Sequence, residues 1–495
     1  MYRRTLQACC AAIVMAAAVA AIAPTAAQKR APADLGASET DPAGTSGADP
    51  ARPGTSAAGR PITPGDAAPP MAQAAVQGAA AALAPQAGRP ARFDDLAGPV
   101  DEDRDAVTPA PRAKPQGPAR RRLAALLTHP EGAPLDVRIG QMLMVGFQGD
   151  DVDQPGPQRI ARHIEAGRLG GVLIFRQNVK SEAALKRLTR LFRASAPPGL
   201  PVLIAVDQEG GQVQRLTDKV GFVATPSAKR VAAEGEPAAR RIYRRLADGL
   251  ADWGFNVNLA PVVDLGNRSD NPIISKLGRA FSGTPDEVAA YAAAFVAAHR
   301  RAGLLTSLKH FPGHGSSRGD THEGFVDISR SWSEAELAPY ATLLAEGMAD
   351  MVMVAHVHLA QYCAEGVPAS LSPQLIEGLL RQRLGFDGVV ISDDMEMGAI
   401  TRLGSPIRIA RRAIEAGNDI LVYAGGAAGS DDLVTRLHKR LAWAARDPAL
   451  AARIDESFAR VRGMKARLPD AARPFVRAPE RTSHRPIEHV ALPHP

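Results

Sequence analysis

Eight short apolar segments, separated by stretches with helical character, constrain the fold of this chain more than any other feature. They cover residues 141–147, 171–175, 201–207, 256–264, 304–310, 351–357, 388–393 and 419–424. Each is rich in Val, Ile, Leu and Met, as expected for parallel strands that are buried on both faces. The spacing of about 30–55 residues leaves room for one helix after each strand. The pattern therefore predicts alternating strands and helices.

Helix start and stop signals lie between these segments. Residues 284–287 read Thr-Pro-Asp-Glu, a predicted cap with proline in the first turn and a reciprocal Glu. Ser372-Pro373 and Ser405-Pro406 predict two more helix starts, and Gly417-Asn418 predicts a helix end before the last strand. Eight such units predict an α/β fold, a single (β/α)₈ TIM-type barrel; a doubly wound open sheet is the alternative, because periodicity does not show closure.

Polar residues that carry chemistry fall at the carboxyl ends of five predicted strands. They are Asp207, Asp264, Lys309, His310, His356 and Asp393. The reactive face of a (β/α)₈ barrel is built from those ends. This coincidence favours the barrel over the open sheet.

The chain has 495 residues, and its composition divides it into four parts. Residues 1–27 predict a signal peptide for export to the periplasm or the medium, with two arginines, an apolar run too short for a spanning helix, and small residues at the end. Residues 28–118 are rich in Ala, Pro and Gly and predict a disordered linker. Residues 119–469 form the predicted barrel domain, and 470–495 a Pro-rich tail.

Cysteine content and charge narrow the possible partners. Cleavage of the signal peptide leaves Cys363 alone, so no internal disulfide and no Cys-based zinc site are expected. The formal net charge of +7 is spread over many arginines, without a basic run interleaved with aromatic residues. Nucleic-acid binding is therefore not expected. After cleavage no stable membrane span is expected, and the oligomeric state is not predicted.

Residues 309–322 concentrate titratable groups in a loop. The segment reads KHFPGHGSSRGDTH, with one lysine, three histidines and one aspartate among glycines and a proline. Such a sequence forms neither a helix face nor a strand, and loops of this kind commonly carry active sites. Asp320 and His322 stand two residues apart, which suggests a carboxylate that orients an imidazole for proton transfer near neutral pH.

Two further segments carry candidate site residues. In the first, a buried strand ends in Ser392-Asp393-Asp394; adjacent strand residues point to opposite faces, so only one of the two carboxylates is expected at the barrel mouth. Asp393 could equally cap the following helix. In the second, DQEGGQVQR at 207–215, Asp207 and Arg215 could bind sugar hydroxyls or could form an internal ion pair.

Together these segments resemble bacterial β-N-acetylglucosaminidases of glycoside hydrolase family 3. That family has the pattern K-H-F-P-G-H-G, four residues, then D-[ST]-H, matched here by 309–322. It also has D-Q-E-G-G-x-V-Q-R, matched by 207–215, and S-D-D near the seventh strand, matched by 392–394. Asn271-Pro272 and Arg279-Ala-Phe281 match a further family segment, so the resemblance covers nearly all of 125–465.

The resemblance implies a retaining β-N-acetylhexosaminidase that removes terminal N-acetylglucosamine from peptidoglycan fragments or similar oligosaccharides, with no cofactor. Asp393 would be the nucleophile, His322 the general acid/base, and Asp320 its orienting partner. The residues that would hold the terminal sugar are Asp207, Arg215, Arg279, Lys309 and His310.

Four alternatives remain open at this point. A metal site is suggested by His310, His314 and His322, although for His314 a bracing hydrogen bond is favoured; His356 could line the pocket or satisfy backbone groups. A β-glucosidase of the same family is disfavoured, because only the 102 residues after Asp393 are available for a second domain. A phosphorylase would transfer the sugar to phosphate, and a non-catalytic wall-binding protein could reuse the barrel.

Overall fold

A computed structural model of the chain describes residues 132–425 and 431–469. The predicted signal peptide (1–27), linker (28–118) and tail (470–495) lie outside the described residues. The described part covers almost all of the predicted barrel domain. Within it, no helix is both long enough and apolar enough to cross a lipid bilayer.

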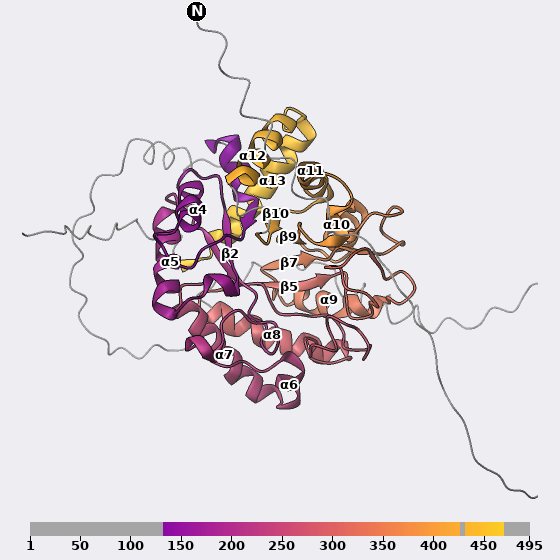
Figure 1. The fold of residues 1–495 in the computed structure, drawn as a ribbon. Coiled ribbons are helices and arrows are strands. Elements are labelled where there is room, and N and C mark those ends of the chain that lie inside the picture. The colour runs from indigo at the N-terminus through magenta and orange to yellow at the C-terminus, as the bar shows by residue number, and fades with distance from the viewer. Residues whose placement is uncertain (1–131, 426–430, 470–495) are drawn as a thin grey trace, which may run out of the picture. The chain divides into compact units, whose positions relative to one another are not determined.

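Eight parallel strands close into a barrel in the order β1-β10-β9-β7-β5-β4-β3-β2, and helices surround it (Figure 1). The strands are β1 (Leu143–Val145), β2 (Gly171–Ile174), β3 (Leu203–Val206), β4 (Val257–Asn258), β5 (Leu305–Phe311), β7 (Met351–Val354), β9 (Val389–Asp394) and β10 (Ile420–Tyr423). Each predicted apolar segment contains one barrel strand, and only β5 and β9 extend one residue beyond the predicted end. Because β5 includes residues 309–311, the expectation that residues 309–322 contain no strand is wrong for these three. The TIM-type barrel is confirmed, and the doubly wound open sheet is wrong because β1 pairs with β10.

One α-helix precedes β1, and the others lie between or after the strands in sequence. They are α3 (Leu135–Gln141), α4 (Pro155–Glu165), α5 (Glu182–Ser195), α6 (Ala228–Ala233), α7 (Glu236–Asp252), α8 (Pro285–Arg301), α9 (Ala338–Ala345), α10 (Gly398–Thr401), α11 (Pro406–Ala416), α12 (Asp431–Ala444) and α13 (Pro448–Lys465). A π-helix, η7, spans Gln374–Arg383, and short 3₁₀ turns are η3 (Arg176–Asn178), η4 (Asp218–Val220), η5 (Glu334–Leu337) and η6 (Ala369–Leu371). A small two-stranded sheet pairs β6 (Val326–Asp327) with β8 (Val357–His358).

The predicted helix signals hold with one correction. Ser405 caps α11 through the Arg408 N–H, and Gly417 ends that helix in the left-handed conformation. At α8 the helix begins at Pro285 as predicted, but the Thr284 side chain makes no cap bond. Ser282 instead donates its hydroxyl to Glu287 and accepts the Thr284 N–H. The capping box was therefore wrong, because a serine two residues earlier takes both partners.

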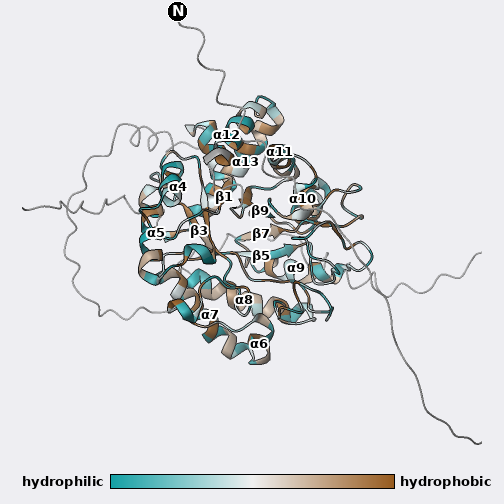
Figure 2. Ribbon diagram, viewed as in Figure 1, coloured by the Kyte–Doolittle hydropathy of each residue, from teal (hydrophilic) through white to brown (hydrophobic). Residues whose placement is uncertain are grey.

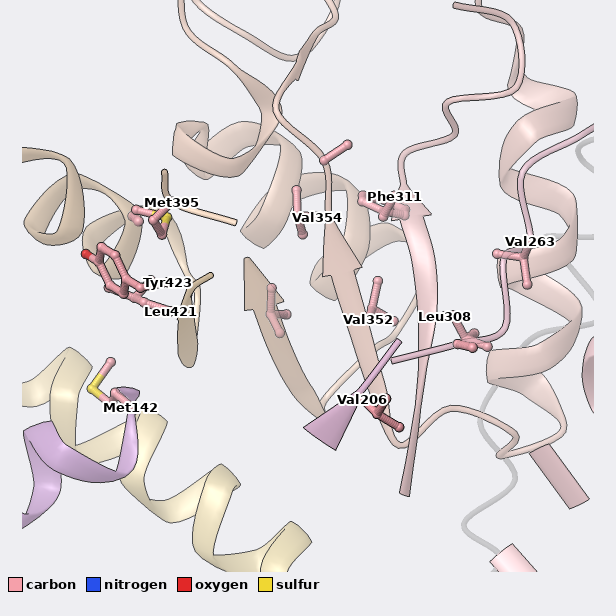
Figure 3. Close-up of a cluster of buried hydrophobic side chains, with 14 of the residues drawn as sticks. Met142, Val206, Val263, Leu308, Phe311, Val352, Val354, Met395, Leu421 and Tyr423 are labelled. Atoms are coloured by element: carbon pink, nitrogen blue, oxygen red, sulfur yellow. The ribbon is translucent and has the colours of Figure 1, made fainter. Parts of the chain in front are cut away.

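Strand residues alternate between two apolar layers, as the pleat requires. One layer lies between strands and helices; Figure 3 shows part of it, including Val206, Leu308, Val352 and Leu421. The other fills the barrel interior with the intervening strand residues, such as Met353. The surrounding helices carry both hydrophilic and hydrophobic stretches, as expected of amphipathic helices that cover a barrel (Figure 2).

The amino end of the barrel is closed by α13. Val461, Met464 and Leu468 join the interior apolar layer. Lys465 is fully buried among them, and its ammonium donates to Gln141 Oε1 and to the Gly170 carbonyl, each at 2.7 Å. Burial lowers the pKa of Lys465 to about 7. This end is therefore packed shut, and the carboxyl end of the strands is the one that opens.

Candidate active site

A pocket of about 320 Å³ opens at the carboxyl ends of the strands. All eight residues selected from the sequence line it: Asp207, Arg215, Arg279, Lys309, His310, Asp320, His322 and Asp393. Four of the eight lie on or directly after the strands β3, β5 and β9. The other four come from the loops that follow β3, β4 and β5. The fold thus brings together residues that are nearly 190 positions apart in the chain.

Asp393 lies near the end of β9 and contributes a carboxylate to the pocket. One oxygen accepts the N–H of Asp394 at 2.8 Å, and the other makes no hydrogen bond within the described part of the chain. Burial alone would raise its pKa, but His310, His356 and the N–H of Asp394 outweigh burial, and the net pKa is lowered. The carboxylate is therefore ionised and has one oxygen available to an incoming carbon.

Asp394, the neighbour of Asp393, has its carboxylate bound to two backbone groups. Its carboxylate accepts the backbone N–H groups of Glu396 and Ala424 at 3.0 and 2.9 Å. Burial raises its pKa to about 6, although these two bonds act in the opposite direction. Asp394 thus ties the end of β9 to the segment after β10. It also lines the pocket beside Asp393, so the expectation of a single carboxylate there is wrong.

The Asp320–His322 pair has the geometry of an oriented imidazole. His322 Nδ1 lies 2.7 Å from Asp320 Oδ1, and the same oxygen accepts the backbone N–H of His322 at 2.8 Å. Because a carboxylate only accepts, Nδ1 carries the proton and Nε2 is left free to take or give one. The ring is 68% exposed at the pocket rim, where an incoming substrate would meet it.

The loop that carries this pair is held at both ends. The carbonyls of Thr321 and His322 accept the N–H groups of Ala399 and Gly398 at the start of α10. Earlier in the loop, Gly315 passes so close to the carbonyl of Leu265 that a Cβ would collide with it. The glycine predicted to permit a turn is therefore required by close backbone approach.

A buried carboxylate, Glu336 on η5, braces the same loop. It accepts the N–H groups of Gly315 at 3.2 Å and Ser316 at 3.0 Å. Burial raises its pKa to about 7. His314 adds a second brace through Ser317 Oγ at 2.7 Å, and burial lowers its pKa to about 4. The bracing role expected for His314 is what the structure shows.

Ion pairs line one wall of the pocket. Lys309 bridges Asp207 at 2.9 Å and Glu209 at 2.7 Å, and Arg279 forms a two-pronged pair with Glu209 at 2.8 Å. Arg215 lies 3.2 Å from Asp207, so the internal ion pair considered for these two residues is present. Burial raises the pKa of each carboxyl, but the facing cations outweigh it and lower both. The wall therefore stays ionised and offers both donors and acceptors to hydroxyl groups.

His310 is fixed between this wall and the barrel. Its Nδ1 lies 2.7 Å from Asp264 Oδ2, and its Nε2 lies 3.2 Å from a nitrogen of Arg279. A guanidinium only donates, so Nε2 accepts and Nδ1–H donates to Asp264. Asp264 also accepts the backbone N–H groups of His310 and His314. Both ring nitrogens of His310 are thus engaged, which leaves neither for a metal.

Two residues of the site were not assigned a role from the sequence. Glu209 stands inside the segment 207–215 that carried the resemblance, and its acidic side chain was the available signal. Asp264 was recognised as a strand-end residue, but its partner, 46 positions away, could not be inferred. His356, left open earlier, satisfies the Asp394 carbonyl with Nε2 and Ser370 with Nδ1 and does not line the pocket.

No group of three or more His, Cys, Asp or Glu residues is arranged to hold a metal ion within residues 132–425 and 431–469. His310, His314 and His322, which suggested such a site, each bond to a protein partner through the nitrogens described above. The site's chemistry is that of carboxylates, imidazoles and cations.

Comparison with known proteins decides the family. The model of the glycosyl hydrolase family 3 N-terminal domain matches residues 134–462. The chain belongs to glycosyl hydrolase family 3. This family 3 chain is 36% identical over 291 residues to a protein of Xylella fastidiosa named beta-hexosaminidase, and the match covers 57% of this chain and 82% of that relative. A beta-hexosaminidase of Pseudomonas aeruginosa is 33% identical over 287 residues, with the same shares covered.

Solved structures agree with the family assignment. A beta-N-acetylhexosaminidase from Beutenbergia cavernae superposes with a TM-score of 0.60 at 31% identity, over 67% of this chain and 98% of that one. A family 3 beta-N-acetylglucosaminidase from Paenibacillus gives a TM-score of 0.62 at 31% identity. That match covers 70% of this chain, and the family 3 chain spans 65% of the Paenibacillus enzyme. The protein is therefore a glycoside hydrolase with the fold of these relatives.

Proposed function

We propose that this family 3 hydrolase is an exo-acting, retaining β-N-acetylhexosaminidase. The observation that carries the proposal is one pocket in which the Asp393 carboxylate and the Asp320–His322 pair both line the cavity. The names of the relatives support an amino-sugar substrate. Peptidoglycan fragments or similar oligosaccharides are the substrates that we infer for it.

The first half of the reaction would form a glycosyl ester. An Asp393 oxygen attacks the anomeric carbon, and the bond from that carbon to the leaving oxygen breaks. His322, protonated at Nε2 and steadied by Asp320, gives its proton to the leaving oxygen. The lowered pKa of Asp393 suits a nucleophile, because it keeps the carboxylate ionised at neutral pH.

The second half would return the enzyme to its starting state. Nε2 of His322, now neutral, takes a proton from water, and the water oxygen attacks the anomeric carbon as the Asp393 ester bond breaks. Two inversions give net retention. A free imidazole has a pKa of about 6.5, so the same group can serve first as acid and then as base near neutral pH without a large pKa shift.

The ionised wall would hold the terminal sugar. Lys309, Arg279 and Arg215 offer N–H donors, and Asp207 offers oxygens that accept from sugar hydroxyls. A volume of about 320 Å³ lies at the lower end of the range of about 300–1,000 Å³ for small-ligand sites, which supports one sugar ring and not a long groove. This size supports removal of terminal residues one at a time.

Substrate comparison tests the activity. The full chain is given an aryl N-acetylglucosaminide and the matching aryl glucoside, each with and without inorganic phosphate. Faster turnover of the amino sugar, with free sugar as product, supports the proposal. Preference for the glucoside, or a sugar phosphate as the product, would replace it with the β-glucosidase or the phosphorylase.

Covalent trapping tests the mechanism. A fluorinated glycosyl inactivator should add one sugar to the chain, and peptide mass mapping should place it on Asp393. Asp393→Asn serves as the control that takes up no label. A label on another side chain, or inverted stereochemistry in the released sugar, contradicts the assignment.

Export is a separate part of the proposal. It rests on the signal-peptide pattern of residues 1–27. Expression of the full chain in a bacterial host, followed by mass measurement of the periplasmic fraction, should give a chain that has lost about that segment. An intact chain in the cytosolic fraction alone contradicts export.

A further inference from the structure

Helix α12 presents cationic and aromatic side chains on one exposed face. Arg436, Lys439, Arg440 and Trp443 follow the spacing i, i+3, i+4, i+7, which aligns side chains along one side of a helix. All four are exposed, and we call them the α12 stripe. The opposite face of α12 packs into the outer apolar layer through Leu433, Val434, Leu437 and Leu441. The stripe is therefore a surface feature on an element that is firmly seated on the barrel.

Trp443 is unusual among the large apolar side chains. It is 62% exposed, and the only other large apolar residue reported as exposed in the described ranges is Phe325, three positions after His322. Phe325 packs against the His358 ring, at 5.3 Å between centroids. A tryptophan left in water beside several cations, on a helix whose leucines and valine are buried, is suited to a contact outside the described residues, because its ring has an apolar body and a polar N–H.

Two cations of the stripe and one neighbouring cation have no ion-pair partner among the described side chains. Lys439 and Arg440 form no ion pair with any carboxylate in residues 132–425 or 433–469, and Arg446, exposed just after the helix, forms none either. The neighbouring Asp447 is engaged by Arg411 at 3.2 Å. Three cations thus surround Trp443 on an open surface.

A second arginine-rich helix gives a contrast. α7 exposes Arg240, Arg241, Arg244 and Arg245, but the same helix carries Glu236, Asp248 and Asp252. Arg240 pairs with Glu236 at 3.2 Å, and none of the aromatic residues of α7 is exposed. That arrangement is the ordinary solvated face of a barrel helix. The α12 stripe differs from it by its exposed tryptophan.

We propose that the α12 stripe docks the barrel on an anionic phospholipid surface. Indole rings prefer the headgroup region of a bilayer, and Lys and Arg are attracted to anionic headgroups. The stripe lies on the outward, convex side of a helix, which fits a plane; an extended polymer would instead need a groove. Trp443 inserts at headgroup level, and the cations beside it contact the lipid phosphates.

The position of the stripe leaves the pocket accessible. α12 follows β10, whose carboxyl end contributes Ala424 to the pocket lining. A barrel helix returns antiparallel to its strand, so Trp443 and Arg446 lie toward the closed end, away from the pocket mouth. α12 also contacts α3 and α11. An enzyme bound to lipid through the α12 stripe would therefore have its pocket opening directed away from the lipid.

The full chain should sediment with vesicles that contain phosphatidylglycerol and not with vesicles of phosphatidylcholine alone. Each basic side chain near an anionic surface is worth roughly a fivefold change in partition, so Lys439→Glu combined with Arg440→Glu should weaken binding at least about 25-fold. Trp443→Ala should weaken it and should also remove any blue shift of the tryptophan emission on binding. Added salt should weaken binding in the wild type, because charge attraction is screened.

The matched control places the same charge change on α7. Arg241→Glu combined with Arg244→Glu should bind vesicles like the wild type, and thermal unfolding shows that every variant is folded, independently of catalysis. Equal loss of binding in the α7 and α12 variants reduces the effect to net charge and overturns the proposal. So does binding to phosphatidylcholine alone, absence of binding, or preference for a soluble polyanion that is insensitive to Trp443→Ala.

Discussion

The two ends of the barrel use the same ionic chemistry for different purposes. At the carboxyl end, Lys309 and Arg215 each pair with Asp207, and all three residues line the cavity; the Arg215 side chain is 26% exposed and that of Asp207 is 16% exposed. At the amino end, Asp419 is completely buried, and Arg381, Arg453 and Ser457 all point at its carboxylate.

The two ends differ in whether protein groups satisfy all the hydrogen bonds of the buried carboxylates. Asp419 also accepts the N–H of Val390, so its two oxygens are saturated by the protein. Asp350, before β7, is saturated in the same way by Arg300, Arg467 and Thr306. Asp393, in contrast, has one oxygen without a partner among the described residues. The carboxylates with complete hydrogen bonds, Asp419 and Asp350, attach helices to the barrel. Asp393, with one oxygen left without a partner, is available for chemistry.

The largest effect is expected for Asp393→Asn. Loss of the nucleophile should reduce kcat by about 10⁴-fold or more, as for other covalent catalysts. Only one backbone hydrogen bond involves this side chain, so the free energy of unfolding should fall less than in the Asp419 variant below. Steady-state kinetics and denaturant unfolding measure the two quantities. A variant with near-normal kcat would remove the basis for treating the two ends differently.

The reverse pattern is expected for Asp419→Asn. It leaves the buried guanidinium groups of Arg381 and Arg453 without their carboxylate, which should lower the free energy of unfolding by about 3–5 kcal/mol. The folded fraction should keep its kcat, because Asp419 lies at the closed end. Asp455→Asn is the matched control: it breaks an exposed pair with Arg138, and such pairs contribute less than about 1 kcal/mol. Equal losses in both variants would contradict the special status of Asp419.

Acid should weaken the fold through two buried histidines. Burial lowers the pKa of His314, in the pocket loop, and of His299, in the outer wall, to about 4. Above about pH 6.5 both histidines are neutral in the folded and unfolded states. As the pH falls toward 4, the histidines bind protons in the unfolded chain but stay neutral in the folded chain, so the unfolded state is favoured. Each histidine should therefore lower the free energy of unfolding by about 2 kcal/mol when the pH is lowered from 7 to 5.

Substitution separates the two histidines. His314→Gln and His299→Gln should each flatten the dependence of unfolding free energy on pH, measured by denaturant titration at pH 7 and pH 5. Only His314→Gln should also reduce kcat, because it removes a brace of the loop that carries His322. An equal reduction of kcat in both variants would contradict a specific role of His314 in bracing the pocket loop.

The fold was predictable because it depends on local patterns. Buried parallel strands require nearly continuous apolar segments, and a barrel requires eight of them, so the sequence was sufficient for strand number and for the reactive end. Residues such as Lys309 and Asp393 were placed at that end by their position in the last residues of a predicted strand. The substrate and the reaction came from the resemblance, since strand-end position alone does not define a role.

The partners within the site could not be predicted. Asp264 contacts His310 across 46 positions, and Glu209 contacts Arg279 across 70. Such pairs depend on side-chain direction, which strand-end position does not fix. The Asp419 cluster was missed for the same reason. The α12 stripe was missed because buried Leu437 and His438 separate its basic residues in the sequence, and only helical geometry aligns them.

The smallest effect is expected at the brace of the pocket loop. Glu336 accepts two N–H groups that precede the Asp320–His322 pair, so Glu336→Ala should let the pair drift and should lower kcat about 10-fold to 100-fold, with a smaller change in KM. Glu336→Gln keeps one acceptor oxygen and should recover part of the loss. Glu334→Ala, two positions away, removes only an exposed pair with Arg383 and should leave kcat unchanged. Should the two alanine variants behave alike, the loop does not need its buried brace, and the pocket end would depend on its charged wall alone.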